Sequence, residues 1–200
     1  MYVTPFSCII KSMANRSYLY AADTLPDSKG LKPDNLIGVC EFNYDYSYSS
    51  LILVGAKPLG IFPSVLWKNS LLIAGDFEKG TELFTKFLTK AQQLGAVNNE
   101  YLTVNSQKVI TYLKNNKRKY FLLEFSELME MDYDMEDMKE IQTYAENLTV
   151  DAEIYAKTEV PRLLESDTWT PAFKDIPKDI LNSRLDLYFT PNLYFDVCAD

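Results

Sequence analysis

The segment from Asp76 to Gly95 constrains the fold more than any other part of the sequence. Asp76 is a favoured helix N-cap residue, and Glu78 follows in the first turn, where a negative charge suits the helix dipole. Gly95 is a typical helix terminator. Between them, one apolar stripe at helical spacing is formed by Phe77, Phe84, Phe87, Leu88, Ala91 and Leu94. A helix with such a stripe has to pack against another element, so we expect a layered fold with a buried core.

Shorter patterns before and after this helix predict what it packs against. Alternating or continuous apolar runs predict strands over 15–22, 120–123, 185–189 and 193–197. Further helices are predicted over 103–114, 135–148 and 175–183. Pro and Gly residues mark 23–32 as a loop. We therefore predict an α+β fold, in which a small mixed or antiparallel sheet carries several amphipathic helices.

Residues 44–56 fit two interpretations. The strand interpretation rests on the alternation of Tyr44, Tyr46 and Tyr48. The helix interpretation rests on the spacing of Tyr48, Leu51, Ile52 and Gly55. Gly55 followed by Pro58 is a helix stop signal, so we favour the helix.

The length and composition predict a single domain in a reducing compartment. The 200 residues, 47% of them hydrophobic and 24% charged, are typical of one soluble domain. We assign it to 13–200 and expect 1–12 to be a dispensable extension, since Met13 offers an alternative start. Neither a signal peptide nor an apolar run of about 20 residues is recognisable. The odd set of Cys8, Cys40 and Cys198 contains no CxxC, which favours reduced thiols with Cys40 packed as a small hydrophobe. We therefore expect a cytoplasmic protein that binds no membrane.

The charge balance argues against nucleic acid as a partner. Asp and Glu number 28 against 20 Lys and Arg, which gives a net charge of −8. Nucleic-acid binders concentrate positive charge on one face to neutralise phosphates. The one dense basic run, 114–119, suits the C-terminal end of a helix, where cations are favoured by the dipole.

The missing residues and motifs exclude several classes of enzyme. Histidine is absent, which removes Ser-His-Asp and Cys-His catalysis and the HExxH zinc sites. The phosphate-binding motifs GxxxxGK[ST] and GxGxxG and the GxSxG elbow are also absent. We therefore assign no catalytic, cofactor-binding or metal-binding residue and lean against an enzyme. A site assembled from distant Asp, Glu, Tyr, Lys or Arg residues stays open.

Two clusters are candidates for binding a partner protein. The first lies in the acidic stretch 124–140, and the second is the tyrosine-rich segment 42–48. The candidate partner-binding residues are Asp132, Tyr133, Asp134, Glu136, Asp137, Tyr44, Tyr46 and Tyr48. Acidic groups attract a basic partner, and tyrosines supply large contact areas with a polar tip. The competing interpretations are a solvated helix N-terminus and ordinary core packing of alternate rings.

A calcium site in the acidic cluster is disfavoured. Asp132, Asp134 and Glu136 resemble the first three ligands of an EF-hand loop. The resemblance then fails, because Asp137 stands where that loop needs Gly and Thr143 stands where it needs Glu.

The string Met13-Ala14-Asn15-Arg16-Ser17-Tyr18-Leu19-Tyr20 resembles the opening of an uncharacterised bacterial family, a domain of unknown function. The resemblance continues through 43–45, 73–80 and 119–124 and covers about 13–130. It transfers no catalytic residue. It implies a small acidic protein of the immunity type that accompanies bacterial antagonism systems.

Three hypotheses for function follow. The first is a cytosolic binding protein of immunity type that masks a basic toxin or effector. The second is a small-ligand binder or enzyme that uses Asp, Glu, Tyr and Arg16, which predicts a pocket lined by carboxylates with perturbed pKa values. The third is a structural or adaptor subunit, which predicts an exposed apolar patch.

Overall fold

The computed structural model describes residues 15–27, 32–95, 99–131, 137–174, 185 and 187–193. These residues form a five-stranded sheet in the order β2-β1-β5-β4-β3, and each neighbouring pair is antiparallel. The strands are β1 (Arg16–Ala22), β2 (Ile37–Asn43), β3 (Pro58–Pro63), β4 (Leu71–Asp76) and β5 (Tyr120–Glu124). The central strand β5 therefore joins two hairpin-like halves of the sheet.

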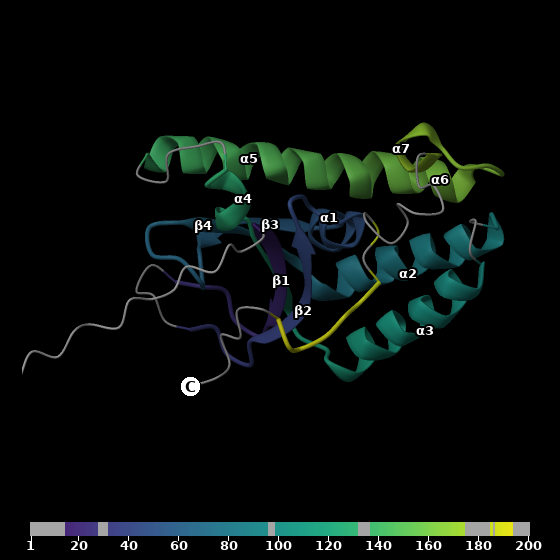
Figure 1. Ribbon diagram of the computed structural model, residues 1–200, viewed down its shortest axis with the longest axis horizontal. Helices are drawn as coiled ribbons and strands as arrows, with labels where there is room; N and C mark the ends of the chain where they lie inside the picture. The colour runs from purple at the N-terminus through teal and green to yellow at the C-terminus, as the bar shows by residue number, and fades with distance from the viewer. Residues whose placement is uncertain are drawn as a thin grey trace, which may run out of the picture.

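Helices cover one face of this sheet (Figure 1). They are α1 (Tyr48–Gly55), α2 (Phe77–Gln93), α3 (Asn99–Asn115), α4 (Ser126–Met129), α5 (Met138–Ile154), α6 (Val160–Glu165) and α7 (Pro171–Lys174). A π-helical turn, η1 (Tyr155–Glu159), joins α5 to α6 without interrupting the helix axis. The long helix α5 packs on one side of the short helix α1, and α2 packs on the other side.

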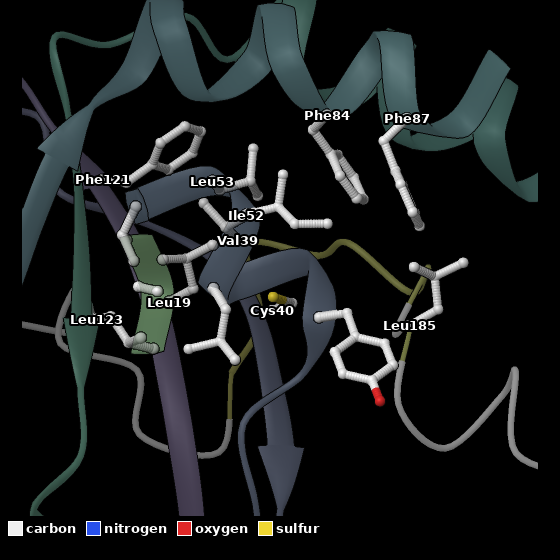
Figure 2. Close-up of a cluster of buried hydrophobic side chains, with 14 of the residues drawn as sticks. Leu19, Val39, Cys40, Ile52, Leu53, Phe84, Phe87, Phe121, Leu123 and Leu185 are labelled. Carbon is white, nitrogen blue, oxygen red and sulfur yellow. The ribbon is translucent and has the colours of Figure 1, made fainter. Parts of the chain in front are cut away.

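The two faces of the sheet carry two apolar clusters because side chains alternate along each strand. On the helical side, Leu19, Phe121 and Leu123 meet Ile52 and Leu53 of α1, with Phe84 and Phe87 reaching in from α2 (Figure 2). On the opposite side, a smaller cluster joins strand residues to Leu36 and Leu193; its strand members are Tyr18, Tyr20, Ala22, Leu72, Ala74 and Leu122. The main core therefore lies between the sheet and the helices.

Two glycines allow α1 to lie unusually close to its neighbours. A Cβ on Gly55 would lie 2.0 Å from the carbonyl oxygen of Ala152 in α5. A Cβ on Gly80 of α2 would lie 2.2 Å from the carbonyl oxygen of Leu53. Both distances are too short for any side chain, so the absence of a Cβ sets the spacing between α1 and the two helices beside it.

Several predictions from the sequence are confirmed. The fold is α+β, and the sheet is antiparallel. Asp76 caps α2 by accepting a hydrogen bond from the Lys79 amide at 3.0 Å, and Gly95 ends the helical region with a φ of +64°. The helix favoured within 44–56 is present as α1, and Cys40 is buried in the core.

The C-terminal prediction needs correction. The strand expected over 185–189 is wrong, because residues 187–190 have no regular secondary structure. Leu185, Leu187 and Phe189 pack their side chains against the helical core. Among the described residues of this segment, the Thr190 amide bonds to β2, at 2.9 Å from the Val39 oxygen. In this segment, burial of the side chains is therefore favoured over backbone pairing as a strand. The helix predicted near 175–183 and residues 194–197 of the last strand lie outside the described residues.

Candidate functional site

The loop between β2 and α1 holds Tyr44 in a strained and exposed position. Tyr44 has a φ of +62°, a backbone conformation that is uncommon for a bulky residue. Its amide donates to the Asn15 carbonyl at 2.7 Å, which fixes the turn, while 64% of the residue's surface is exposed. Strain of this kind is retained where the surroundings over-determine it, and it concentrates at binding sites.

The next residues of the loop are also fixed by hydrogen bonds. Ser17 of β1 donates its hydroxyl to the Asp45 carbonyl at 2.9 Å, and the Asp45 carboxylate accepts from the Tyr46 amide at 2.8 Å. Ser47 then caps α1 by accepting from the Ser50 amide at 3.1 Å. The helix therefore begins at Tyr48, directly after its cap Ser47, and the loop presents Asp45 and Tyr46 beside its first turn.

Tyr46 connects this loop to α5. Its hydroxyl lies 2.8 Å from the hydroxyl of Tyr144, 98 residues later in the sequence. Burial, followed by the interaction with Tyr144, raises the pKa of Tyr46 well above its ordinary value, so the phenol stays protonated at neutral pH. The negative charges of Asp45 and Asp151 raise that pKa further. The tyrosine-rich loop and the flank of α5 thus form one surface.

Asp137, from the acidic cluster, lies on the same surface. It caps α5 by accepting a hydrogen bond from the Lys139 amide at 2.8 Å. It lines a cavity of about 290 Å³ together with Lys139, Glu140, Thr143, Tyr144 and Asn147. Tyr144 therefore stands between Asp137 on one side and Tyr46 on the other.

A second cavity, of about 270 Å³, lies between the loop, the start of α1 and the flank of α5. The described residues that line it are Asp45, Tyr46, Tyr48, Leu51, Leu148, Asp151 and Tyr155. Three tyrosines and two aspartates thus surround one small space, and two leucines supply its apolar part. We call it the tyrosine–aspartate cavity.

The π-helical turn η1 places Tyr155 at the edge of this cavity. Pro161 has no amide hydrogen, and in a regular α-helix its ring would clash with the carbonyl of Lys157. The helix widens just before it, and the Val160 amide bonds to the Tyr155 carbonyl five residues earlier. The ring of Tyr155 then lies 5.0 Å from that of Tyr48 and 6.1 Å from that of Phe173, measured between centroids.

The structure reveals a second polar cluster that the sequence did not predict. Glu127 is only 6% exposed and belongs to α4, although the sequence places it in the acidic stretch. Its carboxylate accepts from the Arg16 amide at 2.9 Å and from the Tyr18 hydroxyl at 3.1 Å. Burial raises the pKa of Glu127, and burial followed by the charge of Glu127 raises the pKa of Tyr18.

Glu124, at the end of β5, is fully buried. Its carboxylate accepts from the Ser64 hydroxyl and the Val65 amide, each at 2.7 Å, and so holds the β3–β4 connection against the sheet. Burial raises the pKa of Glu124 to about 7, although these hydrogen bonds act in the opposite direction. Its position in an alternating strand, where Leu122 and Glu124 share a face, is the one signal in the sequence that could have indicated its burial.

The remaining predicted site residues are distributed as follows. Tyr48 is largely buried and lines the second cavity, while Tyr44, the residue before Asp45, is exposed to solvent. Asp132, Tyr133, Asp134 and Glu136 lie outside the described residues. Within the part of the chain that is described, no group of three or more Cys, Asp and Glu residues converges as a metal site. None of the helices described is both long and apolar enough to cross a membrane.

A family of uncharacterised function matches residues 23–166 of this chain. The chain belongs to this family, described as a domain of unknown function (DUF7822). The family match covers the whole sheet except β1, together with α1 to α6, and so includes both cavities. No curated protein and no solved structure matches the sequence.

Proposed function

We propose that this protein is a protein-binding module that covers part of a basic partner with the surface formed by 44–46 and the flank of α5. The observation that carries the proposal is the Tyr44 turn. A bulky side chain is held at φ +62° by a hydrogen bond and projects into solvent, an arrangement that core packing does not require. Tyrosine is also among the residues enriched at protein interfaces.

The charge of this surface indicates a basic partner. Four acidic residues, Asp45, Asp137, Glu140 and Asp151, lie on it, against one basic residue, Lys139, among the described residues that line its two cavities. The chain as a whole carries a net charge of −8, which adds a long-range attraction to any basic protein. Such complementarity raises the rate of association and suppresses wrong partners.

The finer part of the proposal is an immunity role. Masking a toxin requires no catalytic group, only a rigid surface that competes with the toxin's substrate. The resemblance of the opening sequence to a bacterial family supports this reading, as do the acidic charge and the fixed tyrosine loop. The partner would then be a basic toxin or effector encoded beside the gene for this chain.

A second candidate function, a small-ligand binder or enzyme, is favoured by one observation. Arg16, Tyr18 and Glu127 meet at the end of β1, and the pKa of Glu127 is raised. Perturbed carboxylates beside a cation occur at many active sites, although structural ion-pair networks perturb pKa values as well. Screening metabolites by thermal shift against the wild type and a Glu127→Gln variant would detect this function.

The experiment that tests the first proposal measures binding of the purified neighbouring gene product by calorimetry. We expect a one-to-one complex that weakens as salt concentration rises, because the charges involved are exposed. Tyr44→Ala combined with Asp45→Asn should weaken it at least tenfold, about 1.4 kcal/mol. The control is Glu146→Gln, an exposed change of equal charge on α5 away from both cavities. Equal loss in the control, or no complex at any salt concentration, would contradict the proposal.

A further inference from the structure

The tyrosine–aspartate cavity has the chemistry of a site for an organic cation. Tyr46, Tyr48 and Tyr155 line the cavity. The face of a tyrosine ring carries the negative part of the ring quadrupole, which attracts ammonium and guanidinium groups. Asp45 and Asp151 add two carboxylates at the same place. Among the described residues that line the cavity there is no Lys or Arg, so a cation that enters it meets no like charge from them.

Contacts made by its lining residues hold the cavity in shape. Gly55 and Ala152 set the distance between α1 and α5, and the Tyr46–Tyr144 hydrogen bond ties Tyr46 to α5. The rings of Tyr48 and Phe173 meet edge to face, with centroids 5.7 Å apart. A site that is already formed loses little conformational entropy when it is occupied, which favours binding.

The size of the cavity selects the kind of occupant. At about 270 Å³ it lies just below the range of roughly 300–1,000 Å³ that is usual for pockets holding a drug-sized ligand. It suits one extended side chain that enters with its charged end between the aspartates. Its neighbour on the surface is the exposed Tyr44 turn, which lies on the face proposed to contact a partner.

We propose that the tyrosine–aspartate cavity binds the side chain of one Lys or Arg residue of the basic partner, with the tyrosine rings around its stem and head and Asp45 and Asp151 as its counter-ions. This inference rests on the proposed function and adds a specific anchor to it. Buried anchors of this kind carry most of the energy of many interfaces, and Arg is enriched among them.

The test uses two probes that differ only at the charged end. Nα-acetyl-lysine amide carries the cation, and Nα-acetyl-norleucine amide has a matching aliphatic stem without it. NMR titration of the full chain should show the tyrosine ring resonances of Tyr46, Tyr48 and Tyr155 shifting with the lysine probe and not with norleucine. Equal shifts with both probes would overturn the proposal.

Variants then locate the binding. Asp151→Asn should weaken the lysine probe about tenfold, whereas Glu146→Gln on the same helix should leave it unchanged. Tyr155→Phe keeps an aromatic face and should keep binding; Tyr155→Leu should lose it. Thermal unfolding of each variant confirms that it is folded. If Asp151→Asn and Glu146→Gln weaken binding equally, the probe responds only to the net charge of the protein, and the proposed site is wrong.

The same variants separate this inference from the proposed function. If the neighbouring gene product binds and Asp151→Asn leaves its affinity unchanged, the anchor is wrong and the binding function stands. If the lysine probe binds in the cavity but no basic protein binds, the cation does not come from a partner protein, and the proposed function is wrong. If the partner binds and loses affinity with Asp151→Asn and Tyr155→Leu but not with Tyr155→Phe, both are supported.

Discussion

Two pairs of acidic residues, Glu124 with Glu127 and Asp45 with Asp151, differ in the surroundings of their carboxylates. Glu124 and Glu127 are buried, and their carboxylates accept hydrogen bonds from the chain's own amides and hydroxyls. Asp45 and Asp151 line an open cavity beside tyrosine rings. Acids of the first kind hold elements together, because removing their partners would leave a buried charge unsatisfied. The Asp45 carboxylate accepts a hydrogen bond from the Tyr46 amide, and in the proposed site Asp45 and Asp151 are the counter-ions of a cation from the partner.

The largest expected effect is on the pH dependence of stability, through Glu124. Its pKa of about 7 in the folded state lies above its ordinary value of 4.5, so the folded protein binds this proton more tightly than the unfolded chain. Its contribution to stability is therefore present below pH 4.5, is lost as the pH rises toward 7, and changes no further above that. The loss amounts to roughly 3 kcal/mol.

A Glu124→Gln variant isolates this contribution. Glutamine keeps an acceptor oxygen and removes the titration, so the variant should gain stability relative to wild type by roughly 3 kcal/mol between pH 4.5 and pH 8. Guanidinium unfolding of both proteins at the two pH values measures it. Using the difference between the proteins cancels the titration of Glu127 and Asp76, which both retain. A difference that does not vary with pH would contradict the assignment.

The next largest effect on stability is expected from the distance between α1 and α5, which also forms the tyrosine–aspartate cavity. Gly55→Ala places a Cβ against the Ala152 carbonyl and should destabilise the fold by about 2–3 kcal/mol, because α1 and α5 must separate. It should also weaken the lysine probe, since the cavity lies between these helices. Gly95→Ala, at a position with open space but a φ of +64°, tests whether any glycine change has the same effect; it should destabilise without altering binding.

The secondary structure could be predicted from the sequence only in part. The helix α2 was predictable because Asp76, the apolar stripe and Gly95 are all local signals. Strands β2, β3 and β4 were not predicted, since their runs lack clear alternation and β3 begins and ends with proline. β2 becomes a strand by pairing with β1, β4 by pairing with β5, and β3 by pairing with β4. The β4–β5 pairing depends on residues far apart in the sequence.

The site was predictable only in part, for the same reason. The tyrosines of 44–48 and the acidic residue Asp137 were singled out from composition and charge. Tyr144, Asp151 and Tyr155 were not. Tyr144 bonds to Tyr46, and Asp151 and Tyr155 share the cavity with Asp45 and Tyr46, about a hundred residues away in the sequence. Glu127 was placed in a solvated stretch because the Arg16 amide and Tyr18 hydroxyl that satisfy it are equally distant.

Tyr18→Phe tests the buried acid Glu127 by removing one of its hydrogen-bond donors. It removes a hydrogen bond to the Glu127 carboxylate and should destabilise the protein by about 2 kcal/mol, as expected for a bond to a charged group. Tyr112→Phe is the matched control, because it removes a bond to the neutral Gly38 carbonyl and should cost about 1 kcal/mol. Urea unfolding measures both, and equal losses would argue that Glu127 is protonated in the folded state.

The smallest expected effect on stability belongs to the cavity. Asp151→Asn changes an exposed side chain and should shift the free energy of unfolding by less than about 0.5 kcal/mol. A loss as large as that of Tyr18→Phe would place Asp151 with the buried acids and remove the contrast between the pairs. Thermal unfolding at neutral pH is sufficient to distinguish the two outcomes.

The order of strands in the sheet has a consequence for synthesis on the ribosome. β1 and β4 both pair with β5, which is made last, about a hundred residues after β1. Until residues 120–124 emerge, the β1–β2 and β3–β4 hairpins have no strand to join them, and each keeps an unpaired apolar edge. Nascent chains that stall before β5 should therefore be the species most prone to aggregate and most dependent on chaperones.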